Sequence, residues 1–412
     1  MNLDSIIKKQ GEAAKYMVKE ITHIIKTFEK RSPGTKGEQQ AAEYMADVLK
    51  KDCGCDRVSV EAFEEHPGSF YGWIYITMSL VLAAVVCMFF APIVSIVLIC
   101  LGFLIAFLQF GIYKKFVDFL FPKKTGHNVL ALKKPTGEVK RRIIFNGHID
   151  AAWEWPVNYA LGGAFFEAHA VICAIGAVYY CILAIITSVR YGVISSVTAD
   201  PTLLKCALWG LLFVPFFIGL YFMWNERRVV DGANDNLSGC YMGIAILKYL
   251  KDEGIELENT ELGVLLTGSE EAGLRGSKAW AEKHQGEFDD VPTFIYAYDT
   301  IHDPKYLMAN YRDLNGTVKA DKDASDLFME AAEALNIKCK KGWVPPLGGA
   351  TDSAAFAQKG FRAAGITGLN HKLERYYHTR RDTYDNMNEE GLAGCFAVSV
   401  KTLEMFDEGA KQ

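Results

Sequence analysis

Two histidines and several carboxylates stand where short apolar segments of the chain end. The segments Ile143–Phe145, Leu262–Leu266 and Phe294–Tyr298 are each followed closely by such residues. Because the working residues of open α/β sheets cluster beyond the carboxyl ends of the strands, these residues are predicted to share one site. Imidazole and carboxylate donors without thiolates favour a pair of catalytic Zn²⁺ ions, and Mn²⁺ or Co²⁺ also fit. The residues are His148, Asp150, Asp235, Glu270, Glu271, Asp299 and His378.

Each feature taken alone also has a purely structural interpretation. A strand-end histidine is often an ordinary polar residue with satisfied hydrogen bonds, and Glu270-Glu271 could be a solvated surface pair. Asp235-Asn236 could form a turn and helix cap before the apolar helix predicted over Tyr241–Leu250. Two histidines and several acids at element boundaries together favour one assembled site.

Two long apolar blocks interrupt the segments that carry these residues. From Pro67 to Tyr113 the chain has no Asp, Glu, Lys, Arg or His over 47 residues. A single helix of that length would reach about 70 Å, more than twice the hydrocarbon thickness of about 30 Å. The block therefore predicts two membrane-spanning helices, Trp73–Phe90 and Ile93–Phe110, with the turn at Ala91-Pro92.

The second block predicts another helical pair, Ala170–Val189 and Cys206–Trp224, joined by the segment Arg190–Lys205. Both helices lack charges and are long enough to span a bilayer. Buried helices of a large soluble domain are the alternative for all four, and a re-entrant hairpin is a further alternative for the first pair. One soluble core rarely buries four such helices, which favours four spans.

Basic residues near the helix ends predict the orientation in the membrane. Four spans place both chain ends on one side, and most of the flanking Lys and Arg residues lie on that side, which indicates the cytoplasm. The first residues do not form a signal peptide, and the ten cysteines do not suggest a secreted disulfide framework. We expect a multi-pass integral membrane protein with its catalytic domain and both termini in the cytoplasm. The residues counted are Lys114, Lys115, Lys123, Lys124, Arg227 and Arg228 against Arg190 and Lys205 on the far side.

The remainder of the chain has the size and pattern of one α/β domain. Without the predicted hairpins 71–122 and 169–225, 303 residues remain in three pieces, 1–70, 123–168 and 226–412. Short apolar runs alternate there with helical stretches, which predicts a mixed, mostly parallel sheet with helices on both faces. The net charge of −5 provides no basic excess, so nucleic-acid binding driven by bulk charge is excluded.

These pieces resemble the M28 zinc aminopeptidases, which use two metal ions. The resemblance rests on the order and spacing of six motifs and covers essentially all 303 residues. It departs from the soluble relatives in the two inserted hairpins. The motifs are Arg31-Ser32-Pro33-Gly34 with Gly37-Glu38, Gly147-His148-Ile149-Asp150, Asp231 to Gly239, Gly268-Ser269-Glu270-Glu271, Tyr298-Asp299, and Tyr377-His378-Thr379 with Asp382-Thr383.

The resemblance implies a role for each site residue. His148 would bind one metal and His378 the other, with Asp235 bridging them and Glu271 and Asp299 completing the two sites. Glu270 would act as general base on the metal-bound water, and Asp150 would orient the imidazole of His148. Tyr377 could donate a hydrogen bond to the oxyanion or could simply pack in the core.

Two further segments have open interpretations. Gly348–Ser353 could be a substrate-side loop with Asp352 in the outer shell of the metal site, or a glycine turn with a helix cap at Thr351 or Asp352. Arg375, Arg380 and Arg381 flank His378 and could meet a substrate carboxylate, although a solvated basic face is the plainer interpretation.

The sequence thus predicts a membrane-anchored metallo-aminopeptidase whose partners are peptide substrates and the lipid bilayer. The alternatives are a glutaminyl-cyclase-like or other amidohydrolase on the same fold, and a non-catalytic membrane scaffold or receptor. Because one hairpin is inserted between two expected metal ligands, we also hypothesise that the mouth of the active site faces the membrane surface. The sequence does not indicate the oligomeric state, the preferred substrate residue, or whether the substrate is a peptide or a lipid-linked amide.

Overall fold

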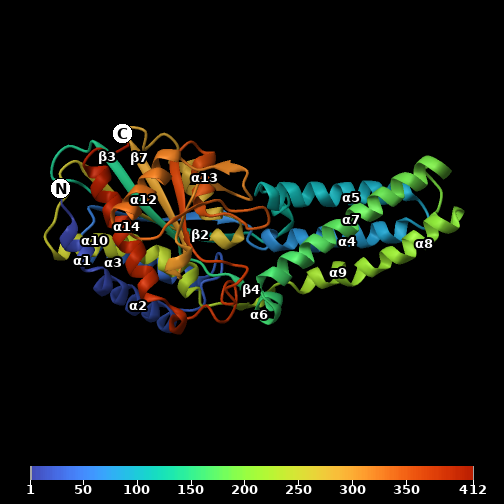
Figure 1. Ribbon diagram of the computed structural model, residues 1–412, viewed down its shortest axis with the longest axis horizontal. Helices are drawn as coiled ribbons and strands as arrows, with labels where there is room; N and C mark the ends of the chain where they lie inside the picture. Colours follow the sequence, from blue (N-terminus) through green and yellow to red (C-terminus); the bar gives the residue numbers. More distant parts are fainter. Residues whose placement is uncertain (1, 412) are drawn as a thin grey trace.

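A computed structural model describes residues 2–411 and shows an α/β domain from which two long helical hairpins project to one side (Figure 1). The domain is built on an eight-stranded sheet in the order β1-β2-β6-β3-β7-β12-β8-β11. The central strands β6, β3, β7 and β12 are parallel neighbours, whereas β1, β2 and β8 run antiparallel to their neighbours toward the centre. The strands are β1 (Arg57–Glu65), β2 (Lys124–Lys133), β3 (Arg141–His148), β6 (Thr260–Thr267), β7 (Thr293–Ile301), β8 (Met308–Asn310), β11 (Lys340–Gly342) and β12 (Arg362–Gly368).

Helices cover both faces of this sheet, which confirms the predicted fold class. Alternate residues of one strand enter different cores: Ile143 and Phe145 pack under the larger helical layer, and Ile144 packs under the other. The larger layer consists of α1 (Asp4–Lys8), α2 (Gln10–Thr27), α3 (Lys36–Lys51), α10 (Ser238–Asp252), α12 (Lys322–Ala334) and α14 (Glu389–Asp407). The opposite layer consists of α11 (Arg275–Lys283) and α13 (Asp352–Gln358).

Four helices in the described chain are long and apolar enough to cross a membrane, as the sequence predicts. They pack as two hairpins that lie side by side and present many large apolar side chains on their outer surface (Figure 1). A hydrophobic surface of this kind is typical of helices that face lipid. The spans are Ser69–Cys87 (α4), Pro92–Gly111 (α5 and η1), Gly163–Tyr191 (α7) and Pro201–Phe222 (α8, η4, α9 and η5).

The spans begin earlier than hydropathy alone indicates. The fourth starts at Pro201 rather than Cys206, because the carboxylate of Asp200 accepts hydrogen bonds from the backbone N–H groups of Thr202 and Leu203 and caps the helix. The third starts at Gly163 and so includes Glu167 and His169. Within the fourth span, Pro215 cannot donate the usual backbone hydrogen bond, and the turn before it tightens to 3₁₀ geometry.

The two hairpins leave the domain through different strand pairs. The first hairpin lies between β1 and β2, which pair antiparallel along nine residue positions from Arg57–Leu132 to Glu65–Lys124. The second lies between β4 (Trp153–Glu154) and β5 (Asn225–Val229), which pair at only two positions with an irregularity between them. A short helix, α6 (Pro156–Leu161), joins β4 to the second hairpin.

Candidate metal centre

Both carboxylate oxygens of Asp235 face a histidine. Oδ1 lies 3.2 Å from Nε2 of His148, and Oδ2 lies 3.0 Å from Nε2 of His378. His148 is the last residue of β3, Asp235 lies in the turn η6 (Ala233–Leu237) ahead of α10, and His378 follows β12 in an irregular segment. Three segments far apart in the sequence therefore meet around one buried carboxylate.

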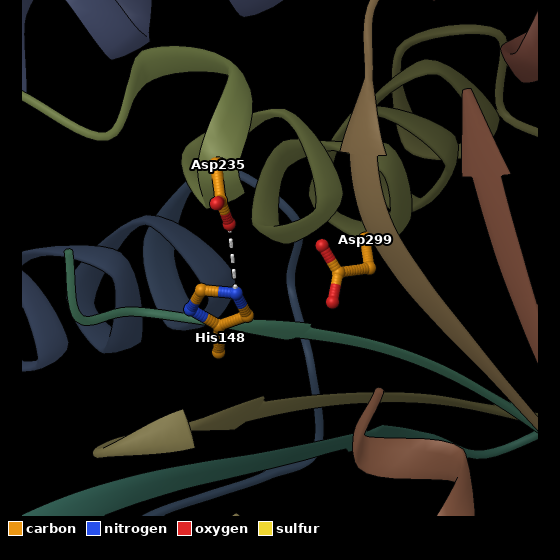
Figure 2. Close-up of side chains that lie close together, drawn as sticks. All are labelled: His148, Asp235 and Asp299. Carbon is orange, nitrogen blue, oxygen red and sulfur yellow. Dashed lines mark ion pairs between the residues drawn. The ribbon is translucent and has the colours of Figure 1, made fainter. Parts of the chain in front are cut away.

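The other acidic residues predicted for the site lie around this group. Oε1 of Glu271 is 3.1 Å from Nε2 of His378, and Oε2 of Glu270 is 3.8 Å from Nε2 of His148. Asp299, from β7, turns its carboxylate toward His148 and Asp235 (Figure 2). Donor atoms of His148, Asp235 and Asp299 lie within 4.8 Å of one another, as do those of Asp235, Glu271 and His378. The structure thus brings together every residue that the sequence analysis selected as a ligand.

Asp150 orients both glutamates as well as the first histidine. Its carboxylate accepts hydrogen bonds from the backbone N–H groups of Glu270 and Glu271, each at 3.0 Å, and lies 3.4 Å from Nδ1 of His148. From the sequence, only the contact of Asp150 with His148 is predicted. One buried carboxylate therefore fixes the turn η7 (Glu270–Ala272) against the end of β3.

Two buried charged residues hold the Asp235 turn from outside. Asp382 accepts hydrogen bonds from the backbone N–H groups of Asn234 and Asp235 at 2.8 and 3.0 Å. Arg31 donates to the carbonyl oxygens of Ile149, Asp231 and Gly232 and so ties the end of β3 to the same turn. Both stand in motifs noted in the sequence, but only the tertiary contacts reveal what they position.

The electrostatics of the cluster indicate a shortage of positive charge. Although burial opposes ionisation, the two imidazoles hold the pKa of Asp235 below its ordinary value. Burial and the charge of Asp235 raise the pKa of Asp299 to about 8, and burial with neighbouring carboxylates raises the pKa of Glu270 well above its ordinary range. Despite burial, Glu271 and Asp235 raise the pKa of His378 to about 10. Buried carboxylates at this density are costly unless a cation compensates them.

The donor atoms fit a pair of divalent metal ions. Nε2 of His148, Oδ2 of Asp235 and Oε1 of Glu271 are buried, and none of them makes a well-formed hydrogen bond within residues 2–411. Buried polar atoms of a native site normally have a partner. Oδ2 of Asp235 and Oε1 of Glu271 both lie close to Nε2 of His378, at 3.0 and 3.1 Å, and Nε2 of His148 lies 3.2 Å from the other oxygen of Asp235. Two imidazoles with carboxylates are a donor set that suits Zn²⁺.

The base of the second hairpin packs against His378. Trp155 donates its backbone N–H to the carbonyl oxygen of His378 at 2.8 Å, and its indole lies edge-on to the imidazole with ring centroids 4.3 Å apart. The ring of Tyr377 stacks on the imidazole at 4.0 Å and also lies edge-on to the Trp155 indole, with centroids 5.8 Å apart. Tyr377 is only half-buried, so packing and contact with substrate are both compatible with its position.

The base of the first hairpin packs against the segment that follows the two glutamates. Arg275 forms a buried ion pair with Asp118 at 2.8 Å, and Asp118 also accepts hydrogen bonds from Ser69 and Gln109. Lys278 donates to the carbonyl oxygens of Tyr113 and Gly273. Each hairpin therefore packs against a different ligand-bearing segment of the centre.

The structure shows which contacts are made by the Gly348–Ser353 loop and by the three arginines that flank His378. Thr351 caps α13 by accepting a hydrogen bond from the N–H of Ser353, as the turn-and-cap interpretation predicts. Asp352 accepts a hydrogen bond from Thr267 at the end of β6. Arg380 is not a freely solvated residue: its guanidinium forms two hydrogen bonds with the buried carboxylate of Glu154, at 2.6 and 2.7 Å. Arg375 and Arg381 are exposed.

A mostly parallel α/β domain with this donor set at its strand ends is a metal-dependent peptidase fold. Residues 221–403 match the profile of peptidase family M28. The match includes Asp235, Glu270, Glu271, Asp299 and His378, whereas His148 lies before it.

Solved structures of similar fold come from aminopeptidases and a related enzyme. The aminopeptidase from Aneurinibacillus sp. strain AM-1 superposes with a TM-score of 0.56 at 14% identity, covering 97% of this chain and 95% of that one. BSAP, a zinc aminopeptidase from Bacillus subtilis, gives 0.54 at 12% identity, covering 96% and 94%. Porphyromonas gingivalis glutaminyl cyclase gives 0.53 at 13% identity, covering 96% and 98%. None of the curated proteins compared by sequence matches the chain.

Proposed function

We propose that the protein is a membrane-anchored aminopeptidase that removes N-terminal residues from peptides with a two-metal centre. The observation that carries the proposal is the position of Asp235, with one carboxylate oxygen toward each histidine and Glu270 beside them. His148, Asp235 and Asp299 would hold one ion, and Asp235, Glu271 and His378 the other. Divalent ions held by these residues would supply an activated water and polarisation of the scissile carbonyl group.

The residues of the chain that do not bind metal carry the proton transfers and the orientation. Glu270 takes the proton of the attacking water and delivers it to the leaving amine, because it is a buried carboxylate next to the ligands whose raised pKa suits a general base. Asp150 fixes the positions of Glu270 and Glu271 by accepting hydrogen bonds from their backbone N–H groups, and it also contacts His148. Tyr377 is placed beside His378 to donate a hydrogen bond to the developing oxyanion.

The membrane part of the proposal rests on the four apolar spans and on the loops beside them. Three exposed apolar residues of the catalytic domain, Trp343, Leu347 and Leu373, lie on loops that contact or adjoin the hairpin bases. The catalytic domain, assembled from 1–70, 123–168 and 226–412, would lie on the cytoplasmic side, as the basic residues at the helix ends suggest. Its metal centre would lie toward the bilayer, because one hairpin is inserted between two of the proposed metal ligands.

A second candidate is glutaminyl-cyclase-like acyl transfer, which the fold similarity to the Porphyromonas gingivalis enzyme supports. The two activities differ in product, since a cyclase would convert an N-terminal glutaminyl peptide to a blocked peptide of nearly the same length. A measured content of two metal ions per chain would favour the peptidase over a one-metal cyclase.

The test is hydrolysis of unblocked and N-acetylated peptides by the full-length protein in detergent with added Zn²⁺. We expect release of the first residue from unblocked peptides only, and a fall in kcat of about 10²- to 10⁴-fold for Glu270→Gln, the range for loss of a general base. Glu270→Gln should retain two metal ions by elemental analysis, whereas Asp235→Asn should lose metal. Cleavage of the acetylated peptides would overturn the aminopeptidase assignment, and no turnover with two metals bound would favour a scaffold or a non-peptide amide substrate.

A further inference from the structure

The first membrane span begins directly against the turn that carries the two glutamates. Phe70, in the first turn of α4, packs on Gly273, where a Cβ atom would come within 2.8 Å of the phenyl ring. Its ring also lies edge-on to Tyr113 at the other end of the same hairpin, with centroids 5.1 Å apart. The hairpin base therefore forms part of the wall around Glu270 and Glu271.

The next residue, Tyr71, is held by aromatic rings from the second hairpin. Its ring stacks on Trp224 at 5.0 Å and meets the edge of Trp153 at 5.7 Å. The phenol oxygen accepts a hydrogen bond from the indole N–H of Trp155 at 3.2 Å. Since Trp155 also contacts the imidazole of His378, the Tyr71 hydroxyl is held one indole away from a metal ligand.

The hydroxyl proton of Tyr71 has no acceptor among residues 2–411. Trp155 occupies a lone pair of the phenol oxygen and leaves the O–H group free to donate. The side chain is almost fully buried, and its helix α4 contacts the turn η7 that carries Glu270 and Glu271. A buried hydroxyl that lies beside an active site without a protein acceptor is available to a bound ligand.

We propose that Tyr71, on the first membrane-spanning helix, is a substrate-binding residue that donates a hydrogen bond to the carbonyl oxygen of the peptide bond being cleaved. The inference rests on the proposed aminopeptidase function and adds that the membrane hairpin completes the substrate site. The carbonyl oxygen is the assigned acceptor because metal ions at the site would polarise that group, and the phenol is held beside the site through Trp155 and His378. Trp155 positions the phenol and does not itself need to touch the substrate.

Tyr75 provides a matched control on the same helix. It lies one turn further along α4, packs on Trp224 and Tyr221, and its hydroxyl makes no side-chain contact with the metal cluster. Tyr75→Phe and Tyr71→Phe thus remove the same hydroxyl group from neighbouring turns of one hydrophobic helix.

The experiment compares peptide binding in the full-length Glu270→Gln protein, which binds without turnover, by calorimetry. Two probes are used: a leucyl tripeptide, and its analogue in which the first carbonyl group is reduced to methylene. Adding Tyr71→Phe should weaken binding of the normal peptide about tenfold, the value of one hydrogen bond, and leave binding of the reduced analogue unchanged. Adding Tyr75→Phe should change neither. In the otherwise wild-type enzyme, Tyr71→Phe should lower kcat/KM by at least the same factor at unchanged metal content.

Equal loss for both probes would mean that Tyr71 shapes the site without donating to the carbonyl, and no loss for either would remove it from the substrate site; both outcomes overturn the inference. If Tyr71→Phe does not fold, Trp155→Phe tests the same hydrogen bond, since a phenol without its indole partner should lose part of the selectivity for the normal peptide. The proposed function fails separately, when the wild-type protein cleaves no peptide.

Discussion

The two hairpins are similar in length and hydrophobicity but are joined to the catalytic domain in different ways. The first continues directly from a nine-position ladder at the sheet edge and is fixed by the Arg275–Asp118 ion pair, both of whose side chains are buried. The second leaves through a two-position ladder and is fixed by Glu154, which is buried, and Arg380, whose side chain is 46% exposed. The first attachment belongs to the sheet, whereas the second depends on loop contacts.

This difference matters because the attachments support different ligand-bearing segments of the metal centre. The segment held by Asp118 begins four residues after Glu271, and the segment held by Glu154 begins two residues after His378. We infer that a substitution at the base of the first hairpin displaces Glu270 and Glu271, which are tied to a well-paired sheet edge. A substitution at the base of the second hairpin affects His378, whose loop can adjust more easily. Four predictions test this contrast.

Asp118→Leu should have the largest effect. It leaves the guanidinium of Arg275 buried without its carboxylate, a situation that costs about 3–5 kcal/mol, and it should also abolish peptidase activity because the Glu270–Glu271 turn loses its support. Thermal unfolding in detergent and metal content measure the two consequences. The double variant Asp118→Leu/Arg275→Met should regain most of the stability. If the single variant unfolds no more easily than the wild type, the buried pair does not hold the hairpin.

Glu154→Gln should have a smaller effect of about 1–2 kcal/mol. The charged hydrogen bonds to Arg380 are lost, but that guanidinium is half in water and can be rehydrated. We expect reduced affinity for the metal on the His378 side, measured by competition with a chelator, while the fold remains. A loss of stability as large as that of Asp118→Leu would remove the proposed contrast.

Acid and alkali should weaken different hairpins. Arg380 keeps the pKa of Glu154 below its ordinary value despite burial, so its stabilisation is complete above the ordinary value of 4.5 and is lost as the pH falls through the lowered value. Burial raises the pKa of Glu65, at the end of β1, to about 7, so the folded state loses stability as the pH rises from 4.5 to about 7. Glu65→Gln should therefore raise the Tm more at about pH 8 than at about pH 5, whereas the penalty of Glu154→Gln should shrink at acid pH.

Surface charges at the hairpin bases should matter least. Lys123 pairs with Glu64 beside the first hairpin, and Arg228 approaches Glu154 beside the second; both basic side chains are about half exposed. Lys123→Ala and Arg228→Ala should each change stability by less than about 1 kcal/mol. A larger effect of either would place the attachment on the surface instead of in the buried contacts.

Most of the fold follows from local sequence patterns. Apolar runs such as Ile143–Phe145 become central strands, because buried parallel strands need continuous hydrophobic residues. The ligands could be selected because strand ends gather functional residues, so His148, Glu271 and Asp299 needed only their positions in the chain. The assignment of roles to Glu270 and Glu271 came from the family order, and their chemistry alone does not distinguish them.

The contacts between hairpins and catalytic domain could not be predicted in the same way. Tyr71 stands in an apolar stretch where an aromatic residue is ordinary, and its proximity to the centre depends on Trp155, 84 residues further along. Arg275 and Asp118 are 157 residues apart, and nothing in either segment marks the other as its partner. Such contacts arise from tertiary packing, and a helix start such as Pro201 depends on a cap that hydropathy does not register.

The placement of the hairpins within the chain also imposes an order on biosynthesis. Strand β1 pairs with β2, which is synthesised only after the first hairpin. Strand β3, which ends in His148, pairs with β6 and β7, and both are synthesised after the second hairpin. Domains assemble as their segments leave the ribosome, so the centre cannot form before both hairpins have been synthesised and can enter the bilayer. A nascent chain is therefore expected to carry no peptidase activity until both hairpins have been synthesised.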